Sequence, residues 1–130
     1  MNYVLLVDIK GSRNIPTAKL WAVLNSLCRR VNQKFDLAVP MVITLGDEWQ
    51  MVCKSRTQCL EVLQYTKEKL GNIEFRAVVG KYSKPTFHIG SVKKFQDYMS
   101  QNCANPLIGE DFRKAHDQLD AKIDGIVILP

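Results

Sequence analysis

The order of hydrophobic and polar positions predicts a chain that begins with a buried strand and an amphipathic helix. The segment Tyr3–Ile9 stays apolar until Asp8, which favours a strand covered on both faces in the middle of a sheet. Apolar residues then recur at helical spacing from Leu20 to Phe35. Pro16 precedes this stripe, and proline suits the first turn of a helix.

Two apolar runs predict a tight β-hairpin in the first half of the chain. They are Val39–Leu45 and Trp49–Cys53, and Gly46, Asp47 and Glu48 lie between them. Glycine followed by an acidic residue between two strand-like runs is typical of such a turn. The hairpin therefore carries two carboxylates, Asp47 and Glu48, at its tip.

The second half of the chain predicts further helices and strands. A helix begins after the capping residue Ser55 or Thr57 and ends at Gly71. The other expected elements are a strand over 73–81, a short helix over 92–99, a helix over 109–119 and a closing strand over 126–129.

The order of these elements predicts the fold class. Strand, helix, strand, strand, helix, strand is the order of an α+β, ferredoxin-like βαββαβ sandwich with an antiparallel sheet, here followed by a C-terminal helix and strand. Its right-handed first crossover places the third strand between the first two, antiparallel to the first. The chain has 130 residues and no linker or repeat, so we expect a single domain over 1–130.

Charge and cysteine content narrow the function classes. The net charge of +5 permits acidic ligands such as nucleotides, but the basic residues are scattered and predict no nucleic-acid arm. The four cysteines form no Cys-x-x-Cys pair, and the chain has two histidines, which argues against a zinc site. The first apolar run is too short to span a membrane and follows no leader, so we expect a cytoplasmic protein with reduced thiols.

The topology predicts that Asp8 and Asp47 meet. Asp8 ends the first strand, and Asp47 precedes the third strand, which runs antiparallel beside it. Two carboxylates held together repel each other, and a divalent ion such as Mg²⁺ relieves that repulsion. The alternative is that Asp8 caps the following loop and Asp47 serves the hairpin turn.

The loop after the first strand is a candidate phosphate site. Lys10, Gly11, Ser12 and Arg13 lead from Asp8 towards the first helix. The first N–H groups of a helix can receive a phosphate, and the two basic residues add positive charge. Carboxylate pair, loop and helix together predict a site for Mg²⁺ and a nucleoside triphosphate.

Three segments carry a resemblance to a known family. The segments 7–12 (VDIKGS) and 44–50 (TLGDEWQ) resemble the two signature segments of the SatD family, and 108–115 (IGEDFRKA) is similar to its later Gly-acidic segment. SatD-like proteins are in turn similar to the class III nucleotidyl cyclases, which have a palm-type ferredoxin-like domain. The resemblance implies that Asp8 and Asp47 hold metal ions and that the chain forms a head-to-tail homodimer.

Three positions depart from the cyclase pattern. Ile43 stands where the cyclases have a purine-selecting lysine. Arg113 and Asp117 stand where they have an asparagine and a transition-state arginine. An acid in place of that cation would repel the developing phosphate charge, so the sequence predicts binding without cyclisation. If the chain is an enzyme, the expected class is metal-dependent nucleotidyl or phosphoryl transfer.

The sequence leaves three function hypotheses. The first is a nucleotide- and Mg²⁺-binding regulatory domain, the second a non-catalytic interaction (dimerisation) domain, and the third a degenerate palm that binds nucleic acid. His116 is interpreted as a surface or partly buried helix residue rather than a catalytic base. Trp21 and Trp49 are interpreted as core or dimer-contact residues.

Overall fold

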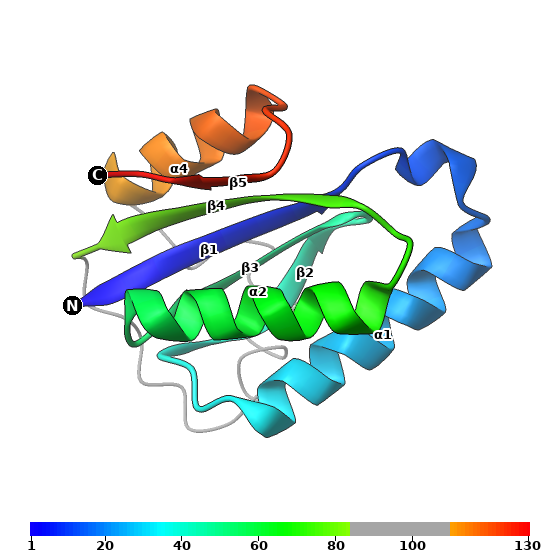
Figure 1. Ribbon diagram of the computed structural model, residues 1–130, viewed down its shortest axis with the longest axis horizontal. Helices are drawn as coiled ribbons and strands as arrows, with labels where there is room; N and C mark the ends of the chain where they lie inside the picture. Colours follow the sequence, from blue (N-terminus) through cyan, green and yellow to red (C-terminus); the bar gives the residue numbers. More distant parts are fainter. Residues whose placement is uncertain (84–109) are drawn as a thin grey trace, which may run out of the picture.

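The computed structural model describes residues 1–83 and 110–130, which form one mixed α+β unit. Within these ranges a five-stranded sheet carries two helices on one face and one helix on the other, as Figure 1 shows. The short helix expected over 92–99 lies outside the described residues, as do the first two residues of the third SatD-like segment.

The helices and strands lie close to the positions that the sequence predicts. In the first half they are β1 (Asn2–Ile9), the 3-10 turn η1 (Ser12–Asn14), α1 (Thr17–Lys34), β2 (Val39–Leu45) and β3 (Glu48–Cys53). In the second half they are α2 (Arg56–Leu70), β4 (Phe75–Tyr82), α4 (Glu110–Asp120) and β5 (Ile126–Ile128).

Local chemistry explains where α2 begins and ends. Ser55 is its N-cap, and the Ser55 hydroxyl accepts a hydrogen bond of 3.0 Å from the N–H of Gln58. Gly71 follows the last turn with a φ of 58°, a left-handed conformation that glycine adopts without a steric penalty. Of the two caps that the sequence allowed, Ser55 is the one used.

β1 lies at the centre of the sheet, whose strand order is β2-β3-β1-β4-β5. β3 and β4 both run antiparallel to β1, and β3 lies between β1 and β2. β5 pairs parallel to β4, so the whole sheet is mixed and the expectation of an antiparallel sheet holds for its first four strands only. The physical reason is the return through α4, because parallel neighbours need a crossover connection.

The two faces of β1 pack against different helices. Leu5 and Val7 belong to the core beneath α1 and α2, together with Trp49. Val4 and Leu6 belong to the core beneath α4. Because side chains alternate along a strand, Asp8 faces α4.

Candidate functional site

Asp8 is a charged residue inside the sheet. None of its surface is exposed, and its register partners are Glu48 on β3 and Arg76 on β4. Directly opposed residues on neighbouring strands project to the same face of the sheet. Glu48, the buried Asp8 and Arg76 therefore form a row across three strands, on the face of the sheet that α4 covers.

The Asp8 carboxylate is only half satisfied. Its Oδ2 atom accepts a hydrogen bond of 2.7 Å from the Nζ of Lys122. Its Oδ1 atom is buried and has no hydrogen-bond partner in the part of the chain that the structure describes. A buried acceptor without a partner costs about 1–3 kcal/mol. This oxygen is therefore free to bind a cation.

Lys122 reaches Asp8 from a strained turn. Its φ of 56° is left-handed, and its N–H donates to the carbonyl of Leu119 in the turn that ends α4. A side chain in this conformation costs about 1–2 kcal/mol relative to glycine. The hydrogen bond to Asp8 raises the pKa of the Lys122 ammonium group, so the lysine stays charged beside the buried carboxylate.

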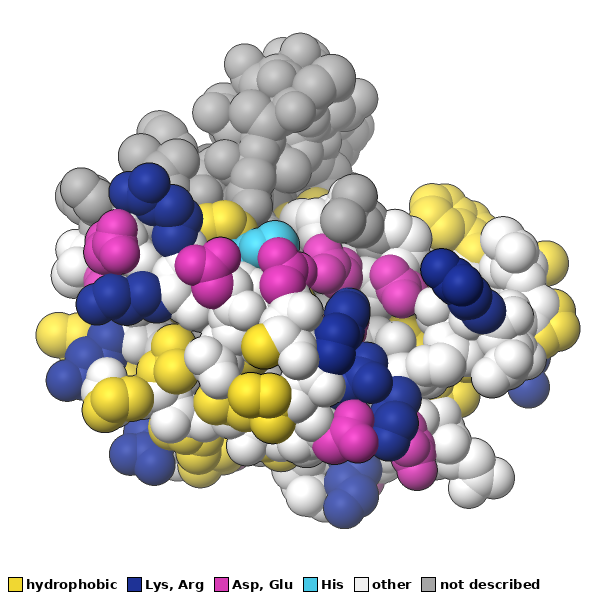
Figure 2. Space-filling model, turned by 90° about the horizontal axis from the view of Figure 1, so that it is seen from above, with side chains coloured by type: hydrophobic (Ala, Val, Ile, Leu, Met, Phe, Trp, Pro, Cys, Tyr) yellow, Lys and Arg dark blue, Asp and Glu magenta, His cyan; other side chains and the backbone are white. Residues whose placement is uncertain are grey.

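Three more titratable side chains lie beside this pair. Glu48, His116 and Asp120 each offer one atom that could bind a metal ion, and these three atoms are within 4.8 Å of one another. The Nδ1 of His116 lies 3.2 Å from the Oδ2 of Asp120, one turn further along α4. We call the five residues the β1-end cluster: Asp8, Glu48, His116, Asp120 and Lys122. Figure 2 shows acidic side chains beside a histidine on this face, with cationic side chains near them.

Glu48 is the member of the β1-end cluster whose carboxylate has no partner in the described residues. Burial raises the pKa of its carboxyl group, and the neighbouring charges of Asp8 and Asp120 raise it further, whereas His116 and Lys122 act in the opposite direction. No hydrogen bond or ion pair to the Glu48 carboxylate occurs within residues 1–83 and 110–130. A half-buried carboxylate in this setting favours either a proton or a bound cation.

Asp47 is tied to the loop after β1. Its Oδ2 accepts a hydrogen bond of 2.8 Å from the Ser12 hydroxyl, and its carbonyl accepts one of 3.0 Å from the N–H of Ile9. The hairpin tip therefore lies against the end of β1, as the topology predicts. The residue in register with Asp8 is Glu48. The Asp8–Asp47 metal pair stays a prediction.

The basic residues of the loop have different surroundings. Lys10 lies 3.1 Å from Asp124 and 3.6 Å from Glu74, and the hydrogen bond to Asp124 raises the pKa of Lys10. Arg13 is exposed and has no ion-pair partner among the described residues. Gly11 has a φ of 68°, which lets the chain turn sharply between them. Arg13 is thus the loop cation that remains available for a phosphate group.

The residues at which the chain departs from the cyclase pattern are not members of the β1-end cluster. Ile43 packs against the core beneath α1 and α2. Arg113 forms an exposed ion pair of 3.3 Å with Glu110, and Asp117 is exposed. None of the three forms a hydrogen bond or ion pair with Asp8 in the described part of the chain.

Sequence reasoning named Glu48 at the hairpin tip without giving it a role, assigned no role to Asp120 or Lys122, and interpreted His116 as a surface or partly buried helix residue. His116 and Asp120 did carry a signal, because residues four apart on a helix share a face. Glu48 could have been chosen over Asp47 only by knowing the register of β1 against β3. Lys122 lies in the turn after α4, where no sequence pattern points towards Asp8.

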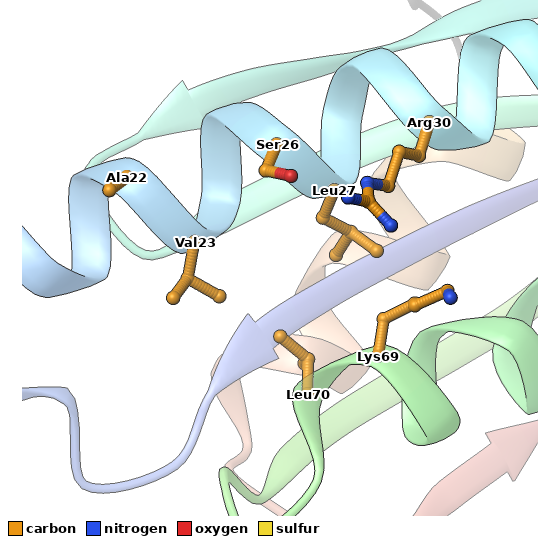
Figure 3. A pocket seen from close by; sticks show the side chains of 7 residues that line it. All are labelled: Ala22, Val23, Ser26, Leu27, Arg30, Lys69 and Leu70. Atoms are coloured by element: carbon orange, nitrogen blue, oxygen red, sulfur yellow. The ribbon is translucent and has the colours of Figure 1, made fainter.

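A second candidate region lies between α1 and α2. A pocket of about 350 Å³ is lined by Ala22, Val23, Ser26, Leu27, Arg30, Lys69 and Leu70. In Figure 3 the apolar side chains Val23, Leu27 and Leu70 point into the gap between the helices, and Arg30 and Lys69 lie together at one end. Trp21, on the same helix, is 62% exposed and does not belong to the core, whereas Trp49 is buried in it.

Comparisons with known proteins do not name a family. The sequence matches no protein-family model, and a search of curated proteins finds no significant match. The resemblance to the SatD family therefore stays a prediction. Among the helices of the described ranges, none combines the length and the hydrophobicity needed to cross a bilayer.

Proposed function

We propose that this protein is a regulatory domain that binds a nucleotide together with a divalent cation at the end of β1, without cyclising it. The observation that carries the proposal is the state of Asp8. Its carboxylate is fully buried at the end of the central strand, one oxygen has no partner, and the other is neutralised by Lys122. A divalent ion would satisfy this free oxygen, to which Lys122 donates no hydrogen bond.

The fold that we propose is a ferredoxin-like sandwich of the nucleotidyl-cyclase type. The strand order β2-β3-β1-β4, with α1 and α2 on one face, supports it. The resemblance of 7–12 and 44–50 to SatD proteins adds support, because these segments contain the end of β1 and the β2–β3 hairpin.

The ligand that suits this strand end is a nucleoside triphosphate. Mg²⁺ is usually held by one or two carboxylates, with waters and substrate phosphates completing its shell. Asp8 and Asp47 would supply the carboxylates, and Arg13, which is exposed, would supply charge for a phosphate. The Ser12 hydroxyl donates a hydrogen bond to Asp47, so a ligand that moves the metal-binding carboxylate would also move the phosphate-binding loop.

The same geometry argues against cyclisation. A cyclase needs a cation to stabilise charge that develops on the attacked phosphate. At the equivalent helix position this chain has the exposed acid Asp117, and the nearby Arg113 is paired with Glu110. Binding without turnover is the property of a sensor rather than an enzyme.

Calorimetric titration of ATP and of GTP, each with excess Mg²⁺, tests the proposal. We expect saturable binding to the wild-type chain that is weakened at least ten-fold in Asp8→Asn and in Asp47→Asn. Asp117→Asn is the matched control, because it removes an exposed carboxylate of α4 outside the β1-end cluster. Absence of binding to the wild-type chain, or equal binding by all variants, would contradict the proposal.

A second candidate function is a dimerisation domain. The observations that favour it are the pocket between α1 and α2 and the exposed Trp21. Light scattering after gel filtration would then give twice the mass of the chain, and Trp21→Ser would restore the single mass. Nucleic-acid binding, the third hypothesis, would instead appear as salt-sensitive retention of a single-stranded oligonucleotide.

A further inference from the structure

We infer that Glu48, His116 and Asp120 bind a divalent first-row transition metal ion beside Asp8, through three ligands that the proposed Asp8–Asp47 magnesium site does not use. Zn²⁺, Co²⁺ and Mn²⁺ accept mixed imidazole and carboxylate ligands, whereas Mg²⁺ prefers oxygen ligands alone. One ring nitrogen and two carboxylates are therefore a ligand set for the first group of ions. This inference does not depend on nucleotide binding.

The distances between the donor atoms suit such an ion. Bonds of about 2.0–2.1 Å in a tetrahedral zinc site place neighbouring ligand atoms about 3.4 Å apart. His116 and Asp120 are already 3.2 Å apart, and the three donor atoms lie within 4.8 Å of one another. Glu48 is the ligand that would have to approach the other two, from no more than 4.8 Å, and no partner in the described residues holds its carboxylate back.

The elements that carry the ligands are firmly packed. Glu48 begins β3, which pairs with the central strand β1. His116 and Asp120 lie on α4, whose residues Ala115 and Leu119 are buried against the sheet. Ligands that project from two packed elements are held near a metal with less loss of entropy than ligands on loops.

The free oxygen of Asp8 is an independent observation that points to a cation here. Asp8 is opposite Glu48 in the register, is fully buried, and has one oxygen without a partner. Its charge is also felt by Glu48, which places the two carboxylates in one electrostatic environment.

The charge balance of the β1-end cluster also favours a cation. Three carboxylates, on Asp8, Glu48 and Asp120, lie beside the ammonium group of Lys122. Arg76, the next cation, is engaged with Asp124 through a contact of 3.1 Å. A divalent ion would offset the excess of negative charge.

Three protein ligands leave room for a further one. Structural metal sites are closed by four protein ligands, whereas sites with three keep a position for solvent or a ligand. The proposed ion would therefore keep a position open for water or another small ligand.

The test is a titration of the full chain with Co²⁺ in chelator-treated buffer, followed by visible absorption and calorimetry. We expect one equivalent to bind with a visible band that reports nitrogen and oxygen ligands. His116→Gln and Glu48→Gln should each weaken binding at least ten-fold, and Asp117→Asn, on the same helix, should not change it. A chain without stoichiometric Co²⁺ binding, or with binding that both variants retain, would overturn the inference.

A second measurement covers the case in which a variant fails to fold. Co²⁺ is paramagnetic, so it should shift the imidazole proton resonances of His116 in the wild-type chain. Unshifted His116 resonances at saturating Co²⁺ would overturn the inference. His116→Gln should retain Mg²⁺-dependent nucleotide binding, which separates a failure of this site from a failure of the proposed function.

Discussion

The two faces of the central sheet differ in how completely their buried groups are satisfied. The face beneath α1 and α2 is a large apolar core, and its one buried polar side-chain atom without a partner, within the described chain, is the neutral indole nitrogen of Trp49. The face beneath α4 is a smaller core that ends in the buried charge of Asp8. Here Lys122, whose backbone is in a left-handed conformation, pairs with that buried charge.

This difference separates a face built for stability from a face suited to binding. Strain and unsatisfied polar groups reduce stability, and proteins retain them mostly at functional sites. The α1–α2 face holds the larger apolar core, and the α4 face combines a smaller apolar core with a buried charge that reduces stability. Variants on the two faces should therefore change stability by different amounts and with different signs.

The largest effect is expected from the α1–α2 core. Leu24→Ala removes a side chain of α1 that is fully buried, which should cost about 3 kcal/mol through lost transfer energy and a cavity. Urea denaturation followed by circular dichroism measures the change. Leu60→Ala, at a residue of α2 that is 41% exposed, is the matched control and should cost much less. Equal losses of unfolding free energy in the two variants would contradict the assignment of Leu24 to the core.

The next effect is expected at Lys122. Lys122→Met leaves Asp8 buried without its ammonium partner and should cost about 2 kcal/mol, less than for a fully buried pair because the Lys122 side chain is 54% exposed. Lys122→Gly also loses the ammonium group but relieves the left-handed strain, so it should be about 1 kcal/mol more stable than Lys122→Met. Urea denaturation of both variants tests this. Identical stabilities would show that the turn is not strained.

The smallest effect on stability is expected at Glu48. The substitution there should stabilise the fold, whereas those at Leu24 and Lys122 should destabilise it. Glu48→Gln should raise the Tm by about 2 °C at neutral pH, because it removes a half-buried charge beside Asp8. Burial raises the folded pKa of this carboxyl group, so ionisation destabilises the fold at pH values above the ordinary pKa. The gain should therefore disappear as the pH falls below that ordinary pKa. Thermal unfolding at neutral and acidic pH measures it, and a lower Tm at neutral pH would contradict the account.

The arrangement of elements was predictable from the sequence because strong local patterns mark it. The continuous apolar run of β1 predicted its central position, and Gly46 with Asp47 predicted the hairpin. The parallel addition of β5 was not predictable, because three residues of strand carry no sign of which neighbour they pair with or in which direction.

The candidate site was predictable only in part. Asp8 followed from the end of a buried strand, but its neighbours depend on register, and a one-residue slip exchanges the side chains on each face. That is why Asp47 was expected where Glu48 lies opposite Asp8. Cysteine and histidine spacing, on which the expectation of no zinc site rests, does not reveal ligands from distant segments such as Glu48, His116 and Asp120.

The central claim is that the end of β1 binds a divalent cation through Asp8. Anomalous diffraction from crystals grown with Mn²⁺ and a non-hydrolysable nucleotide tests it most directly, because the ion is located without reference to any variant. The account predicts an anomalous peak within ~2.5 Å of an Asp8 carboxylate oxygen, with the Lys122 ammonium group displaced from it. A map with no peak at Asp8 and with the Lys122–Asp8 ion pair intact would contradict it.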